Sequence, residues 1–397
     1  MKKIVIFAFA ALLLAGCGDK KADVIFRHGE CVQLFPDATN GDEYLMEMTF
    51  EDFDLDTAMY YAEQLHGQAD PAVVGKCSSV WNPAGYHGRN LDFYVNTLAD
   101  VVLHMAAGEG RYASVGMSTC NPRMTLEHLT DGTMSEAEWA TLPLTMTDGI
   151  NENGVSVNIN VVPANESTPV TGTHPEGCTL SATFVVRYLL DNARSAEHAK
   201  ELLRELNVIG DPQGTLPFEY HWMVSDATRC FVAEIWNNEM VILPGQDIMT
   251  NFFHSQTMEV DPYGEGHERY AILQAHYDEG ATMEGMMGLM QRVWYSQAYS
   301  TDIDPVWYSE FASAEDSLNY LAFVRGDKVM RERFQQMLER VGSAYQSLDY
   351  QKSVRAADNP NWYTTHTVVF DQHRKTFSIV EQENAGSVHT FGMMSNK

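Results

Sequence analysis

Residues 77–92 read CSSVWNPAGYHGRNLD, and this stretch decides the fold. Two short segments with strand-like alternation are separated by a Pro-Ala-Gly turn, a pattern that predicts a β-hairpin. Such a hairpin can set Cys77, Arg89 and Asp92 within a few ångströms of one another. If the chain is cut before Cys77, its α-amine joins them, and one residue supplies both nucleophile and base.

The composition describes a folded, acidic protein. The chain has 397 residues, of which 45% are hydrophobic and 20% charged, enough to bury a large core in one big domain or two. Lys and Arg number 26 against 54 Asp and Glu, which gives a formal net charge of -28. Such a surface repels nucleic acid and anionic lipid, so we expect neither as a partner. The simplest role of this charge is to keep the protein soluble.

The N-terminus has the features of a secretory signal. Lys2 and Lys3 precede the apolar run 4–14, which is too short to span a bilayer. The run closes on small residues and then Cys17, which resembles the lipobox of bacterial lipoproteins. That resemblance implies a signal peptide over 1–17, a lipid on Cys17, and a protein in the periplasm or anchored to a membrane. The alternative is an ordinary signal with a chance cysteine.

Export would make disulfide bonds possible among the remaining cysteines. The sequence does not assign their pairs, and free buried cysteines fit equally well. The four cysteines concerned are Cys31, Cys120, Cys178 and Cys230.

The chain divides at Cys77. Residues 18–76 form an acidic segment, within which Leu55–His66 has helical spacing. From Cys77 onward we predict strands at 77–81, 86–93, 112–119, 154–162, 219–225, 229–236, 240–243, 364–370 and 376–380. Helices are predicted at 180–192, 196–206, 267–276, 283–295, 312–324 and 328–345. Runs of strands with segregated helices indicate an α+β layered domain over 77–397.

Nothing in the sequence calls for a cofactor. Four histidines lack the spacing of metal ligands, so we expect no metal site: His221, His254, His267 and His366.

Several motifs occur in an order that resembles one known family. They are Tyr112–Thr119, Met146–Val155, the helix Thr183–Leu190 with Asp191–Ser195 after it, His221–Asp226, Ile248–Asn251 and Gly266–Tyr270. Together with the hairpin they resemble the choloylglycine hydrolases, or linear amide C–N hydrolases, of the N-terminal-nucleophile superfamily. The resemblance covers about residues 77 to 270, and loosely the hairpin around Val368–Asp371.

The resemblance implies a four-layer αββα sandwich in which the nucleophile begins a central strand. Cys77 would become N-terminal when the Lys76–Cys77 bond is cut. Its α-amine, with an ordinary pKa of about 7.7–8.0, would move a proton near neutral pH. Arg89 would favour the thiolate, and Asp92 would orient the α-amine. The alternative for Arg89 and Asp92 is an ion pair on a surface hairpin.

The resemblance also assigns three more residues. Asn251 matches the asparagine whose side-chain N–H faces the oxyanion, although a turn asparagine is the alternative. Asn160 has the right type for a second donor, but a register without gaps would give Val161 instead. Arg269 matches an arginine that completes the charged network; the alternative is an exposed helix arginine.

The chain departs from the family pattern in two ways. A prosegment over 18–76 must be cut off before Cys77, as in the acid ceramidase-like amidases. The cut would separate a lipid on Cys17 from the catalytic chain unless the prosegment stays bound. Only the seventeen residues Phe252–Glu268 separate Asn251 from Arg269. Bile-salt hydrolases insert a loop there that helps to build their tetramer, so the oligomeric state is open.

We therefore expect a hydrolase that cuts the linear amide of a small acyl conjugate without a cofactor. Bile-salt conjugates, N-acyl amino acids, acyl-homoserine lactones and penicillin V all fit the site. An acyltransferase with the same acyl-enzyme is one alternative. An uncleaved lipoprotein that only binds an acyl ligand is another.

Overall fold

The computed structural model describes residues 24–27, 30–36, 44–51, 53–65, 76–94, 100–119, 133, 135–163, 177–209, 218–256, 266–294, 362–381 and 383–393. The predicted signal peptide with Cys17 lies outside these residues, as do Cys120 and the predicted helices at 312–324 and 328–345.

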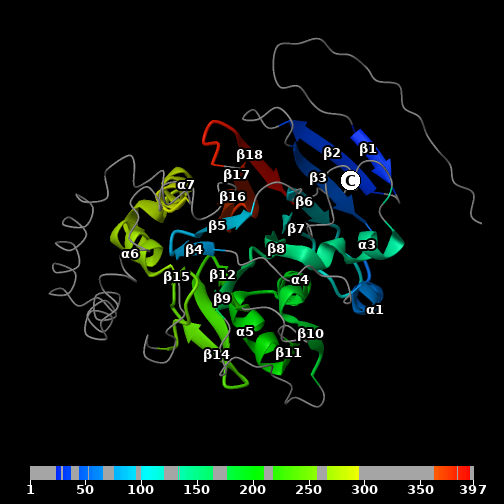
Figure 1. The fold of residues 1–397 in the computed structure, drawn as a ribbon, viewed down its shortest axis with the longest axis horizontal. Helices are drawn as coiled ribbons and strands as arrows, with labels where there is room; N and C mark the ends of the chain where they lie inside the picture. The colour runs from blue at the N-terminus through cyan, green and yellow to red at the C-terminus, as the bar shows by residue number, and fades with distance from the viewer. Residues whose placement is uncertain are drawn as a thin grey trace, which may run out of the picture.

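Two large sheets form the centre of the molecule (Figure 1). The first has ten strands in the order β1-β2-β3-β6-β7-β8-β9-β12-β13-β14, and the second has six in the order β15-β4-β5-β16-β17-β18. The strands of the first are β1 (Val24–Arg27), β2 (Glu30–Pro36), β3 (Tyr44–Phe50), β6 (Asp100–Met105), β7 (Ser114–Thr119), β8 (Met146–Asn151), β9 (Ser156–Pro163), β12 (Phe218–Asp226), β13 (Arg229–Trp236) and β14 (Glu239–Pro244). Those of the second are β4 (Lys76–Asn82), β5 (Tyr86–Tyr94), β15 (Ile248–Met249), β16 (Trp362–Asp371), β17 (Thr376–Glu381) and β18 (Val388–Gly392).

Helices and a short third sheet complete the described fold. The α-helices are α1 (Leu55–Leu65), α3 (Glu136–Thr141), α4 (Val185–Asn192), α5 (Ala196–Glu205), α6 (His267–Ala275) and α7 (Met283–Gln291). The 3-10 helices are η1 (Leu142–Thr145), η2 (Ala182–Phe184) and η3 (Tyr277–Ala281), and the third sheet pairs β10 (Thr179–Ser181) with β11 (Asn207–Ile209).

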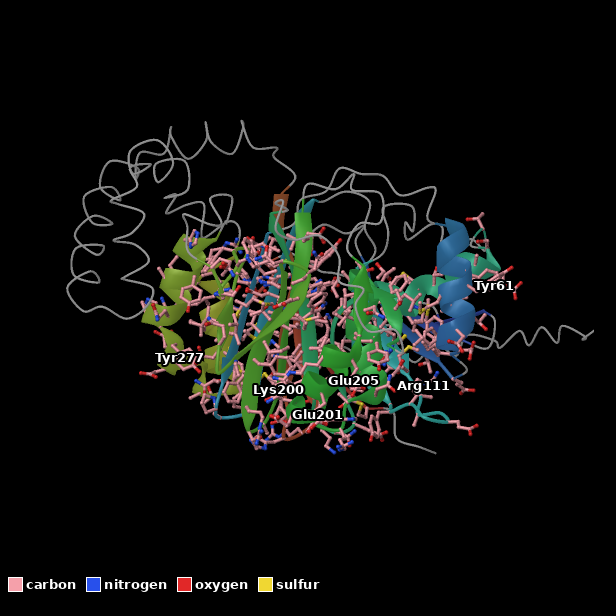
Figure 2. All side chains as sticks on the ribbon, turned by 90° about the horizontal axis from the view of Figure 1, so that it is seen from below. Tyr61, Arg111, Lys200, Glu201, Glu205 and Tyr277 are labelled. Atoms are coloured by element: carbon pink, nitrogen blue, oxygen red, sulfur yellow. The ribbon has the colours of Figure 1, made fainter. Side chains whose placement is uncertain are left out.

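Successive residues of a strand point to opposite faces of its sheet, so neighbouring side chains pack in different hydrophobic cores. On β16, Val368 lies in the core between the two sheets, whereas Val369 packs against α6 and α7. On β6, Val102 faces the second sheet, whereas Val101 and Leu103 lie in the core beneath α3, α4 and α5. The layers therefore run helix, sheet, sheet, helix, which confirms the expected α+β sandwich. Figure 2 shows Tyr61 of α1 and Tyr277 of η3 at opposite ends of the molecule.

The hairpin of β4 and β5 forms as the sequence predicts. The turn closes through the Gly85 N–H, which donates to the Asn82 carbonyl at 2.9 Å, and Gly85 has a φ of 86° that favours glycine. Gly88 is required for packing, because a Cβ there would lie 2.7 Å from the Met290 Cγ of α7.

Two predictions about elements are wrong. The strands begin well before Cys77, because β1, β2 and β3 belong to the ten-stranded sheet. The helix predicted from Leu180 begins at Val185, because residues 179–181 pair with β11 and residues 182–184 form η2. Most other predicted elements within the described residues match to within a few residues.

Two of the cysteines considered for disulfides are free in the structure, Cys178 being exposed and Cys230 buried. Among the described helices, none combines the length and the apolar character needed to cross a membrane.

Candidate active site

Strand register places Cys77 and Arg89 on one face of the second sheet. Cys77 lies opposite Leu91, and Arg89 lies opposite Ser79, so period-two alternation turns both functional side chains to the same side. The Arg89 Nη2 is 3.7 Å from the Cys77 Sγ. Asp92 is opposite Lys76 and points to the other face, toward the α6 side.

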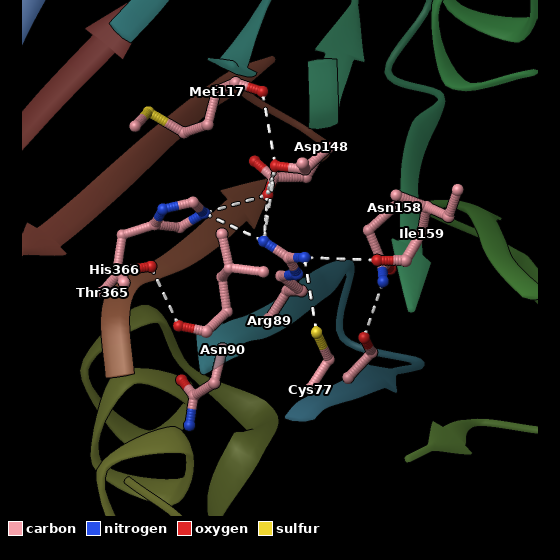
Figure 3. A network of polar contacts seen from close by, with 12 residues as sticks. Cys77, Arg89, Asn90, Met117, Asp148, Asn158, Ile159, Thr365 and His366 are labelled. Atoms are coloured by element: carbon pink, nitrogen blue, oxygen red, sulfur yellow. Dashed lines mark hydrogen bonds and ion pairs between the residues drawn. The ribbon is translucent and has the colours of Figure 1, made fainter. Parts of the chain in front are cut away.

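Arg89 is held by two residues to which the sequence analysis gave no role. Its Nη1 donates to the Asp148 Oδ2 at 2.8 Å and lies 3.0 Å from the His366 Nε2 (Figure 3). The His366 Nε2 is itself 3.1 Å from the same Asp148 oxygen. The Nη2 that faces the sulfur also donates to the Ile159 carbonyl, at 3.2 Å. These contacts come from β8, β9 and β16, so both sheets fix the guanidinium.

Burial governs the protonation of this cluster. It raises the pKa of the Cys77 thiol, while the charges of Arg89 and Arg269 act in the opposite direction. Burial also disfavours the charged form of Asp148, but Arg89 and the hydrogen bond from His366 outweigh it and hold the pKa of that carboxyl below its ordinary value. Asp148 is therefore an ionised partner for Arg89.

Asn251 contacts the backbone nitrogen of Cys77. Its Oδ1 accepts from the Cys77 N–H at 2.8 Å and from the Arg269 Nη2 at 2.7 Å. Its Nδ2 donates to the Val161 carbonyl at 2.6 Å. This differs from the expected role, because in the uncut chain the side-chain N–H of Asn251 is occupied by a strand carbonyl. The oxygen, and not the amide nitrogen, faces Cys77.

Arg269 bridges the residues around Cys77 from the first turn of α6. Its Nη1 donates to the Cys77 carbonyl at 2.5 Å and to the Ser78 Oγ at 2.9 Å, and it lies 3.6 Å from the Asp92 Oδ2. Gly266 precedes the helix with a φ of 81°, and a Cβ there would lie 2.5 Å from the Arg269 Nη2. Glycine at this position therefore leaves room for the guanidinium.

Asp92 is buried, and one of its two oxygens accepts no hydrogen bond. Its Oδ1 accepts from the Thr364 Oγ1 at 2.6 Å, whereas its Oδ2 has no hydrogen-bond partner. Burial raises its pKa to about 6, while Arg269 acts in the opposite direction. A buried acceptor without a donor is costly, so this oxygen marks a position where a donor would be stabilised.

Asn160 forms no hydrogen bond with Cys77. Its Nδ2 makes long contacts, 3.3 Å to the Ser79 Oγ and 3.5 Å to the Met249 carbonyl. The structure thus brings five of the six predicted catalytic residues into one contact network and leaves Asn160 beside it. Their catalytic roles stay predictions.

Two histidines that lack ligand spacing in the sequence meet in space. The candidate ligand atoms of His221, Glu234 and His254 all lie within 4.8 Å of one another. Both Glu234 oxygens, however, accept backbone N–H groups, from His254 at 2.7 Å and from Ser255 at 3.0 Å. This carboxylate therefore fixes the turn that follows Asn251.

The geometry can be compared with known proteins. Residues 79–264 match the family model of linear amide C–N hydrolases of the choloylglycine hydrolase family. The resemblance to the choloylglycine hydrolases is confirmed. The match contains Arg89, Asp92, Asn160 and Asn251, begins just after Cys77 and ends before Arg269.

Solved structures of choloylglycine hydrolase type are also found, at low similarity. A mutant of the conjugated bile acid hydrolase from Clostridium perfringens is 14% identical over 81% of this chain and 92% of its own, with a TM-score of 0.42. Penicillin V acylase from Agrobacterium tumefaciens is 16% identical over 80% and 86%, with a TM-score of 0.38. Among curated proteins, no match is found.

The Arg89–Asp148 pair gives a testable expectation. In Asp148→Asn, Arg89 loses the buried charge that balances it, and removing one partner of such a pair costs about 3–5 kcal/mol. We expect the free energy of unfolding in urea to fall by about that amount. Glu279→Gln, which breaks an ion pair with Arg292 on the exposed surface, is the control and should change little. An Asp148→Asn protein as stable as the wild type would show that this pair does not hold Arg89.

Proposed function

We propose that the chain is the precursor of an amidohydrolase whose nucleophile is Cys77, made N-terminal when the protein cuts its own Lys76–Cys77 bond. One observation carries the proposal. The Cys77 nitrogen binds the Asn251 Oδ1, and its sulfur faces Arg89. Asp92, whose Oδ2 accepts no hydrogen bond, pairs across the two strands with the preceding residue, Lys76. These acceptors and charges lie around Cys77, whose sulfur would be the nucleophile and whose backbone nitrogen would become the α-amine.

The cut would use the chemistry of the mature site. The Cys77 sulfur attacks the Lys76 carbonyl carbon, forming a thioester as the C–N bond breaks, and the nitrogen takes a proton to become an amine. Water then hydrolyses the thioester, which leaves a carboxylate on Lys76 and restores the thiol. Cys77 is 2% exposed in the uncut chain, which suits an intramolecular attack better than the entry of a separate substrate.

The freed amine would meet a prepared environment. A new N–H can donate to the Asp92 Oδ2, the buried acceptor that accepts no hydrogen bond and lies 3.6 Å from the Arg269 Nη1, while another keeps the bond to the Asn251 Oδ1. The positive charges of Arg89 and Arg269 disfavour an ammonium, and they oppose the burial that raises the pKa of the Cys77 thiol. The amine would then be neutral near physiological pH, as a general base must be.

Turnover follows from these roles. The neutral α-amine takes the proton of the Cys77 thiol as the sulfur attacks the amide carbonyl of an acyl conjugate, and it passes that proton to the leaving amine as the C–N bond breaks. Water then hydrolyses the thioester, which releases the acyl group and restores the thiol. Asn160 is a candidate oxyanion donor, because its two Nδ2 contacts, at 3.3 Å and 3.5 Å, are weak. Conjugated bile salts, N-acyl amino acids, acyl-homoserine lactones and penicillin V are the substrates to screen, each with an acyl group and a linear or strained amide.

The location of the enzyme is also a proposal. A signal peptide over 1–17 and a lipid on Cys17 would place it in the periplasm or on a membrane. Product analysis with added amine separates a hydrolase from an acyltransferase. An intact Lys76–Cys77 bond in mature protein would favour a binding lipoprotein.

Self-cleavage is tested by intact mass. Wild-type protein should yield a chain that begins at Cys77, and Cys77→Ala should stay uncut because it has no sulfur to attack the Lys76 carbonyl. Cys178→Ser, which removes an exposed free cysteine, should be cut like the wild type. Equal cutting in Cys77→Ala would assign the cleavage to another protease.

The rate of cutting should depend on pH through Asp92. Its raised pKa of about 6 means that the carboxyl loses its charge as the pH falls through that value. An uncharged Asp92 cannot stabilise the amine that forms as the bond breaks, so cutting should slow below about pH 6. The measurement is the rate at which urea-unfolded precursor, diluted into buffers on both sides of that pH, is cut.

Asp92→Asn is the matched variant, and it should be slow at every pH without this inflection. If Asp92→Asn keeps the wild-type pH dependence, another group controls the step.

A further inference from the structure

The acidic segment before Cys77 supplies an interior part of the first sheet. β3 lies between β2 and β6 and pairs with β6 in parallel, from Met46 opposite Val101 to Phe50 opposite Met105. A strand in this position satisfies the backbone hydrogen bonds of both neighbours. In Figure 1 the three blue strands continue the sheet past β6 without a break.

The side chains of β3 enter two different cores. Leu45 packs between the sheets, in the same cluster as Phe370 and Phe377 of the second sheet. Met46, Met48 and Phe50 lie in the core beneath the helices, and each is at most 3% exposed. Removing β3 would thus open both cores at once.

Polar contacts also tie the segment to later residues. The His104 Nε2 lies 2.7 Å from the Glu47 Oε1, and the Ala106 N–H donates to the Phe50 carbonyl at 2.9 Å. Arg111 donates to the Phe53 carbonyl and stacks over the ring of the same residue. Figure 2 shows Arg111 at the end of the molecule where α1 lies. Ala58 of α1 packs against Leu144 and Phe184.

We infer that the segment before Cys77 is not discarded after the cut but stays bound as a second, non-covalent subunit of the mature enzyme. The inference rests on the proposed cleavage, which breaks one peptide bond and none of these contacts. Loss of the segment would expose the β6 edge, with its unpaired N–H and C=O groups, beside apolar Val101 and Leu103. An exposed apolar edge of this kind favours aggregation over a stable free chain.

Retention has a consequence for the site. The strand order β3, β6, β7, β8 leads directly to Asp148, which holds Arg89. The bound segment therefore supports the element that positions the guanidinium beside Cys77. It would also keep a lipid on Cys17 attached to the catalytic chain, although no peptide bond would join them.

Purified wild-type protein gives the first test. Denaturing mass spectrometry should resolve two chains, and native mass spectrometry should find them as one species whose mass is their sum. Two chains under denaturing conditions, with the Cys77 chain alone in the native measurement, would overturn the inference. A single uncut chain would instead count against the proposed cleavage, and a second experiment then decides retention.

That experiment places a recognition sequence for a specific protease within residues 66–75 of the full chain and cuts it in vitro. The two pieces should co-elute in size exclusion and separate only in denaturant. In the same background, Met48→Asp should lower the retained fraction severalfold, because it puts a charge into the core, whereas Tyr60→Ala should not, because Tyr60 is 61% exposed. Separation of the two wild-type pieces in native buffer would contradict the inference, as would equal retention in both variants.

Discussion

The register between β4 and β5 is the constraint on which the site depends. Cys77 opposite Leu91 puts the sulfur and the Arg89 guanidinium on one face and the Asp92 carboxylate on the other. A slip of one residue would exchange these faces and separate the sulfur from Arg89. The register is fixed by the turn at Gly85 and by the close packing of Gly88 against α7. A turn and a packing requirement on the opposite face of the hairpin thus help to determine which groups meet at Cys77.

Two buried arginines stand on either side of this residue, and each is matched by a carboxylate. Arg89 is paired with Asp148 at 2.8 Å, and Arg269 lies 3.6 Å from Asp92. Buried charges persist only when they are paired. The longer distance in the second pair leaves one Asp92 oxygen without a hydrogen-bond donor. A new amine can therefore donate to Asp92, while Asp148 keeps Arg89 in place beside the sulfur.

Much of this arrangement follows from the sequence because it is local. The hairpin carries Cys77, Arg89 and Asp92 within sixteen residues, and turn chemistry with alternation predicts their meeting. Asp148 and His366 were missed because strand pairing brings them from distant positions. The available signals were an acid within the motif Met146–Val155 and a histidine among β-branched residues. The strands before Cys77 were missed because an acidic composition hid the apolar Leu45, Met46 and Met48. The Asn251 amide points its oxygen toward Cys77 because the Arg269 guanidinium donates to that oxygen and the Val161 carbonyl accepts from the amide nitrogen. The spacing of these residues along the sequence does not show that they are close in space.

The central claim is that thiol and primary amine belong to one terminal residue. The most direct test is reaction of active enzyme with a 2-cyanobenzothiazole, which condenses selectively with 1,2-aminothiols, followed by peptide mapping. The account predicts that the label is found on Cys77, that activity is lost in proportion to labelling, and that a good substrate slows both. Fully active protein in which Cys77 remains unlabelled, or in which its nitrogen is still joined to Lys76, would contradict it.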